Sequence, residues 1–231
     1  MLTVFPVRVD RVDRETARSA MLWAPAVGAL VGACQALVHL LFAGTGGLLA
    51  AALAVGSGAV LTRALHLDGL ADVADGLGSG RPGPQALEIM KRSDIGPFGV
   101  VALLFTLLIQ VAALTAAPHP AAALVVSAAA GRLAITWACT PGVPAARPDG
   151  LGATVAGTVP LASAVALTVA LLLASTAALP WLAAPAVLGG LTAAHLFRRH
   201  LTRRLGGVTG DVLGSLTELT ATTTLVILTL G

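Results

Sequence analysis

From Pro97 to Ala116 the chain reads PFGVVALLFTLLIQVAALTA, a stretch without a single charged residue. About 20 apolar residues is the length that an α-helix needs to cross the ~30 Å hydrocarbon core of a bilayer. The 231-residue chain is 56% hydrophobic and only 11% charged, too little charge to cover a soluble protein of this size. Long apolar runs without ten-residue alternation favour helices over a closed barrel. The sequence therefore predicts an all-α, polytopic transmembrane helical bundle.

About seven spans of this kind can be placed along the chain. They cover residues 20–42, 47–65, 97–116, 121–139, 159–178, 181–197 and 212–230. The sixth is short and contains a proline, and the seventh is rich in Thr and contains Glu218, so six spans plus a re-entrant segment is the alternative count. We expect residues 1–231 to form a single integral membrane domain.

Charge placement predicts the orientation of these spans. Basic residues collect before the first span and after the second, fourth and sixth, in residues 8–18, 81–92, 147 and 198–204. The intervening connections contain no Asp, Glu, Lys or Arg. By the positive-inside rule, the charged connections and the N-terminus lie in the cytoplasm.

Three aspartates interrupt the apolar pattern in residues 66–77, which read HLDGLADVADGL. On a helix, Asp68, Asp72 and Asp75 have i, i+4, i+7 spacing and share one stripe. Like charges this close repel one another, and either a hard divalent cation such as Mg²⁺ or raised pKa values relieve the repulsion. We interpret the stripe as a metal site.

The stripe opens the longest connection between spans, residues 65–96, which we predict to be the catalytic cytoplasmic segment. Glycines and prolines at 78–84 mark turns, and a short helix is expected from Gln85 to Arg92. This arrangement would let Lys91, Arg92 and Asp94 fold back over the three aspartates.

A second constellation, RRLGGVTGDVLGSLTE, covers residues 203–218. Asp211 and Glu218 are seven residues apart on one helical face, and the glycines, including Gly207 and Gly210, suit an anion at a helix start. An ordinary turn with Asp211 as the N-cap is the alternative. A carboxylate two turns inside an apolar helix, as at Glu218, is expected to have an internal partner or a function.

Two further arginines are candidates. Arg132 lies inside a predicted span, either as a counter-ion for one of the acids or as a phosphate ligand. Arg147 lies in the polar turn ARPDGLG, where it either binds phosphate or is a solvated loop charge. Carboxylates for Mg²⁺, nearby cations and glycine-rich turns together indicate phosphoryl-group chemistry at the membrane surface. They do not identify a substrate.

Four ordered motifs carry a resemblance to a known family. They are LHLDGLADVADG (65–76), LEIMKRSDIGPFG (87–99), ARPDGLG (146–152) and LGGVTGDVLG (205–214). On these motifs the chain resembles the cobalamin synthase family, adenosylcobinamide-GDP ribazoletransferase. In the second motif Arg92 and Asp94 stand in the opposite charge order to many members, and Ala146 replaces an expected aromatic residue.

The resemblance implies a Mg²⁺-dependent reaction late in cobalamin biosynthesis, in a bacterial plasma (inner) membrane. A hydroxyl of α-ribazole, or of its 5′-phosphate, would attack the phosphorus on the aminopropanol arm of adenosylcobinamide-GDP, and GMP would leave. We assign Asp68, Asp72, Asp75 and Asp211 to the metal, and Asp72, Asp75, Asp211 and Lys91 to catalysis. The predicted substrate-binding residues are His66, Arg92, Asp94, Arg132, Arg147, Gly207, Gly210 and Glu218.

Other functions remain open at this level. A CDP-alcohol phosphatidyltransferase would require Ala-Arg after its Asp-Gly, whereas Ala71 is followed by Asp72. A prenyltransferase would require two separated acidic motifs, and an ion transporter would require acids at both membrane faces. We expect membrane lipid as a partner and no nucleic acid. Gly28 and Gly32 form a small-xxx-small pair that serves either a homo-oligomer or internal packing, and other corrinoid-pathway enzymes are candidate partners.

Overall fold

The computed structural model describes residues 13–230, and these confirm the all-α prediction. They form ten α-helices, one short 3₁₀ helix and no named strand. The helices are α1 Arg14–Leu41, α2 Gly47–Leu61, α3 Leu65–Gly78, α4 Gly83–Ile89, α5 Pro97–Ala116, α6 Pro120–Ala138, α7 Gly150–Val155, α8 Leu161–Ala178, α9 Ala183–Leu205 and α10 Gly210–Ile227, with the 3₁₀ helix at Ala43–Thr45.

Each of the seven predicted spans coincides with one long helix, but not all of these helices have the character of a span. Length and apolar composition single out α1, α5, α6 and α8. A fifth arises only if α2 and α3 are counted together, although they meet at an angle of 89°. The described residues thus support four or five spans, and the count of seven stays a prediction. We place α3 outside the spanning segments, because it contains three aspartates in 14 residues.

The break between α2 and α3 has a local backbone cause. Arg63 and Ala64 have φ values of 54° and 55°, the left-handed region that non-glycine residues rarely adopt. Two such residues in succession end one helix and start the next in a new direction. The predicted span 47–65 therefore ends as a helix at Leu61.

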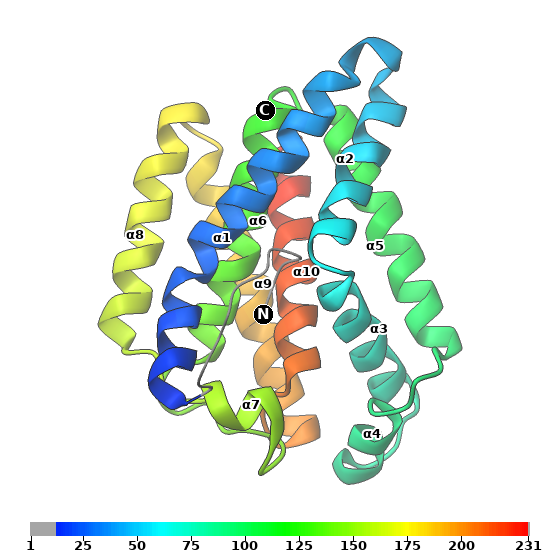
Figure 1. The fold of residues 1–231 in the computed structure, drawn as a ribbon, viewed down its shortest axis with the longest axis vertical. Helices are drawn as coiled ribbons and strands as arrows, with labels where there is room; N and C mark the ends of the chain where they lie inside the picture. Colours follow the sequence, from blue (N-terminus) through cyan, green and yellow to red (C-terminus); the bar gives the residue numbers. More distant parts are fainter. Residues whose placement is uncertain (1–12, 231) are drawn as a thin grey trace.

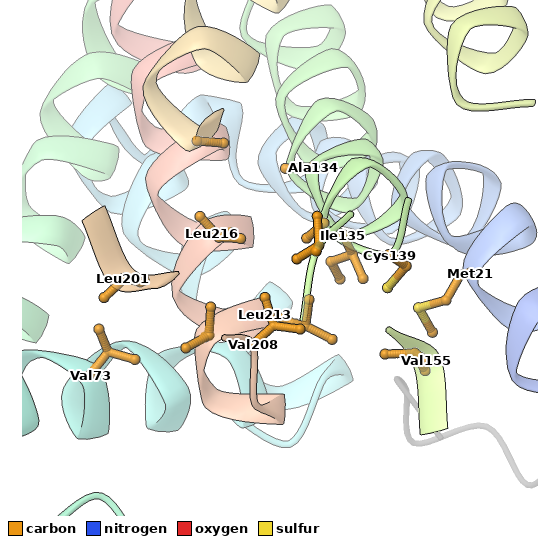
Figure 2. Close-up of a cluster of buried hydrophobic side chains, with 14 of the residues drawn as sticks. Met21, Val73, Ala134, Ile135, Cys139, Val155, Leu201, Val208, Leu213 and Leu216 are labelled. Carbon is orange, nitrogen blue, oxygen red and sulfur yellow. The ribbon is translucent and has the colours of Figure 1, made fainter. Parts of the chain in front are cut away.

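The helices are arranged around α6 and α10 (Figure 1). In this view α8 stands at one side and α3 and α5 at the other, while α4 and α7 lie at the same end of the molecule. Figure 2 shows Leu213 and Leu216 of α10 between Val73 of α3 and Ile135 of α6. This apolar cluster supports the end of the bundle that carries the acidic stripe.

Small residues allow α1 to approach α6 closely. A Cβ on Gly28 would lie 2.9 Å from the Ala129 Cα, and one on Gly32 would lie 2.7 Å from the Val125 Cα. The small-xxx-small pair is therefore used for packing within the chain. Of the basic residues before α1, Arg8 and Arg11 lie outside the described residues. Arg14 donates to the carbonyls of Ala153 and Ala156, at 3.0 and 2.8 Å, and so joins the start of α1 to the end of α7.

Candidate active site

The crossing of α3 and α10 brings two acidic motifs together. A Cβ on Gly69 would lie 2.7 Å from the backbone oxygen of Asp211, and one on Gly214 would lie 3.2 Å from the Cα of His66. The Gly69 position is too close for a side chain and the Gly214 position is tighter than an ordinary contact, so glycine lets the two backbones approach each other. Asp211 therefore sits against the helical turn that carries Asp68 and Asp72. Sequence spacing predicted the stripe on α3, but not this crossing.

The carboxylates at the crossing interact electrostatically. Burial, together with the charges of Asp211, Asp68 and Asp75, raises the pKa of Asp72 to about 7, while Arg147 opposes the shift. Burial also raises the pKa of Asp211, against the hydrogen bond from Thr209 and the charge of Arg147. Asp68, Asp72 and Asp211 therefore form a site with three carboxylates and one nearby cation, the guanidinium of Arg147. Such a site is suited to a cation or to a cation-bound phosphate.

Asp75 differs from the other acids of the stripe. Its carboxylate accepts hydrogen bonds from the backbone N–H of Gly96, at 2.7 Å, and of Gly99, at 2.9 Å. These groups belong to the start of α5, where helical N–H groups have no partner in the helix itself. Asp75 thus fixes α5 against α3, and any role as a metal ligand would use its remaining lone pairs.

The second motif returns to the stripe, as expected, but through its glycines. Lys91, Arg92 and Asp94 are exposed, in the turn between α4 and α5. The structure brings Gly96 and Gly99 to Asp75 instead. The catalytic and substrate-binding roles predicted for the three charged residues therefore remain predictions for a substrate-bound state.

Arg147 connects the second, third and fourth motifs. Its Nη2 donates to the Leu87 carbonyl at 2.6 Å. The neighbouring backbone pairs with the segment before α10, since Ala146 N donates to Val208 O at 3.0 Å and Val208 N donates to Pro144 O at 2.9 Å. The side chain of Arg147 is therefore fixed by a hydrogen bond beside Asp72 and Asp211, and is not a freely solvated charge of a loop.

The glycines before α10 have separate roles. A Cβ on Gly207 would lie 2.6 Å from Ala146 N, so this glycine is required for the pairing with the third motif. A Cβ on Gly210 would meet nothing closer than Leu151, at 3.7 Å. The N-cap of α10 is Thr209, whose hydroxyl accepts from Val212 N at 3.2 Å. The alternative with Asp211 as the N-cap is thus corrected, and Asp211 lies in the first turn with its side chain next to Thr209.

Arg132 and Glu218 do not join the carboxylates of α3. They line a cavity of about 70 Å³ inside the bundle, together with His66 and Gln110. Gln110 Nε2 donates to Glu218 Oε2 and to Thr222 Oγ1, both at 2.9 Å. Gln110 was missed in the sequence, although a lone amide inside the apolar stretch 97–116 was the available signal.

The donors at the α3–α10 crossing fit a hard divalent cation in their chemistry. Within residues 13–230, no three His, Cys, Asp or Glu side chains are gathered closely enough to cage a metal ion. Mg²⁺ commonly takes one or two carboxylates, with water and substrate phosphates completing its shell. A partial carboxylate set beside an open site is consistent with that mode of binding.

Comparison of the sequence with known proteins assigns the chain to a family. A family model described as cobalamin-5-phosphate synthase matches residues 1–229. The chain belongs to the cobalamin-5-phosphate synthase family. The resemblance inferred from the four motifs is thereby confirmed. The first and fourth motifs cross at α3 and α10, and the second and third are joined to them by the hydrogen bonds of Asp75 and of the backbone at Ala146.

Similar members of the cobalamin-5-phosphate synthase family span the whole chain. A Frankia casuarinae protein is 43% identical, with 99% of this chain and 91% of the relative covered. Proteins of a Nocardioides species and of Stutzerimonas stutzeri are also 43% identical, with 97% and 94% of this chain and 93% and 90% of the relatives covered. All three are named adenosylcobinamide-GDP ribazoletransferase. No solved structure matches the chain.

Proposed function

We propose that this protein is an adenosylcobinamide-GDP ribazoletransferase, which joins adenosylcobinamide-GDP to α-ribazole or its 5′-phosphate and releases GMP. The observation that carries the proposal is the meeting of four family motifs around Asp68, Asp72 and Asp211, beside Arg147. The names of the full-length relatives supply the substrates.

The chain's own residues would do most of the work by charge and position. One or two of the carboxylates of Asp68, Asp72 and Asp211 would hold a Mg²⁺ ion, which would offset the charge of the diphosphate. Asp211 is also the candidate base, because its raised pKa suits a carboxylate that takes a proton from an attacking ribose hydroxyl. As the new oxygen–phosphorus bond forms, the bond to the GMP oxygen breaks. Arg147 would stabilise the negative charge that moves onto GMP.

Asp75 and Lys91 would have supporting roles. Asp75 holds the start of α5 against α3, and so fixes the helix that presents Asp72. Lys91 is exposed in the turn between α4 and α5 and would contact the phosphates of a bound substrate. We further propose an inner-membrane protein with this site and the N-terminus on the cytoplasmic side, in keeping with the arginine-rich connections.

The deciding experiment measures GMP release by the purified protein in detergent. The reaction contains adenosylcobinamide-GDP, α-ribazole 5′-phosphate and Mg²⁺, with an EDTA control. Release of GMP with formation of a cobalamin product, lost in EDTA, is the expected result. A folded protein that releases no GMP under these conditions would refute the proposal. Release of diphosphate from an isoprenoid, or of CMP from a CDP-alcohol, would point to the alternative transferases, and flux without conversion would point to a transporter.

A further inference from the structure

An apolar cavity adjoins the carboxylate site and has no role in the scheme above. It has a volume of about 220 Å³ and lies where α1, α3, α6, α7 and α10 meet. Its wall is formed by Met21, Leu65, His66, Ile135, Leu151, Gly210, Asp211, Leu213 and Gly214. Asp211 therefore faces two environments: the acids of α3 on one side and an apolar chamber on the other.

The size of the chamber suits a bicyclic aromatic ring. A cavity of about 150 Å³ lined by apolar side chains is large enough to bind benzene, which has six ring atoms. The chamber here is larger by roughly one half, and a benzimidazole has nine ring atoms. Guanine has a similar size but presents polar groups around its edge, and burying these in an apolar wall without partners would be costly.

His66 belongs to this wall and also to the wall of the smaller cavity that contains Arg132. His66 is only 4% exposed, and its Nε2 is buried without a hydrogen-bond partner among the described residues. A buried ring nitrogen normally has a partner. A benzimidazole nucleoside has one free ring nitrogen and an otherwise carbon-only edge, so it could supply that single polar contact. A lipid chain would leave the nitrogen unsatisfied.

From this size, polarity and position, we infer that the chamber is the subsite for the benzimidazole base of the ribazole substrate. The inference rests on the proposed function and extends it to substrate recognition. With the base between Leu151 and Leu213, the attached ribose would emerge at Gly210 and Asp211. Gly210 lies at this exit, where a Cβ would be in van der Waals contact with Leu151 at 3.7 Å, so glycine leaves the most room for the ribose. The attacking hydroxyl would then meet its candidate base.

The test fills the chamber from α7. Leu151 is half-buried, so Leu151→Trp should fold while its ring occupies the space of the base. Leu173→Trp is the matched control, because Leu173 lies on α8 and is 69% exposed. Binding of α-ribazole to the purified protein is measured by calorimetry without the corrinoid or the metal, and the KM of each substrate is measured separately.

We expect Leu151→Trp to weaken α-ribazole binding and raise its KM at least tenfold, with the KM of adenosylcobinamide-GDP changed less than twofold. The control should match the wild type. Unchanged α-ribazole affinity in a Leu151→Trp protein with a wild-type melting temperature would overturn the inference, even if GMP release continues. If no GMP is released but α-ribazole still binds in a Leu151-dependent manner, the reaction is wrong and the subsite stands.

A second experiment does not depend on a variant. Free 5,6-dimethylbenzimidazole should compete with α-ribazole, and 5,6-dimethylindane, which lacks both nitrogens, should compete at least fivefold less well because His66 gains no partner. Equal competition by the indane or by a dodecyl chain would identify the chamber as a general apolar or lipid pocket, and would also overturn the inference.

Discussion

The two polar regions of the molecule differ in how their acidic side chains are balanced by neighbouring groups. At the α3–α10 crossing, three carboxylates share one nearby arginine, and Asp72 has a pKa raised to about 7. Inside the bundle, Glu218 has Gln110 as a direct donor and shares its cavity with Arg132. The first region has more carboxylates than cations, whereas in the second region Glu218 has both a hydrogen-bond donor and an arginine nearby. This difference indicates where a ligand is needed and where the charges mainly serve the fold.

The sharpest way to break this comparison is Asp72→Asn. The change removes a carboxylate while keeping its shape, so we expect GMP release to fall about 1000-fold, equivalent to roughly 4 kcal/mol of barrier. The melting temperature should not fall, because a repulsive charge is lost. Retention of activity at saturating Mg²⁺ would mean that the acidic region is not the reaction centre.

A backbone change tests whether the crossing itself matters. Gly69→Ala should reduce GMP release about 100-fold and lower the melting temperature, since its Cβ would lie 2.7 Å from Asp211 O. Gly56→Ala is the matched control, because a Cβ on this glycine of α2 would meet nothing within 4 Å. We expect less than a threefold change for Gly56→Ala. Similar losses in both variants would contradict a specific need for backbone contact at Gly69.

The pH dependence of GMP release tests whether Asp72 in the acidic region binds a metal ion. A protonated Asp72 cannot hold a cation, so the rate of GMP release should fall about tenfold per unit as pH drops below about 7 at low Mg²⁺. Raising the Mg²⁺ concentration should move this midpoint to lower pH, because metal and proton compete for one carboxylate. A midpoint that is independent of Mg²⁺ would argue against a metal-binding Asp72.

The internal region should affect stability more than turnover. Gln110→Leu removes the donor to Glu218, and an unsatisfied buried acceptor costs about 1–3 kcal/mol. We expect a lower melting temperature with GMP release within threefold of the wild type. Glu218→Gln, which keeps a hydrogen-bonding side chain, should have the smaller effect on both. A large loss of turnover with unchanged stability would instead give Glu218 the substrate role predicted from sequence.

Local patterns predicted much of the fold, because apolar runs and helical spacing are properties of single segments. The helix at 97–116 was predicted to the residue, and the stripe of Asp68, Asp72 and Asp75 was recognised from spacing alone. The contact between Gly69 and Asp211 could not be predicted in this way, because it depends on how two distant helices pack. For the same reason, the hydrogen bonds of Asp75 to Gly96 and Gly99 appear only in the structure.

The crossing of α3 and α10 also has a consequence for the synthesis of the protein chain itself. α10 follows every other described helix in the chain, and Asp211 stands at its beginning. During synthesis, α3 is therefore made long before its partner leaves the ribosome, and its aspartates wait without the residues that complete the site. Chains that stall before α10 would be inserted but inert. Assembly of the reaction centre is thus a late step, because it requires that α10 has been synthesised.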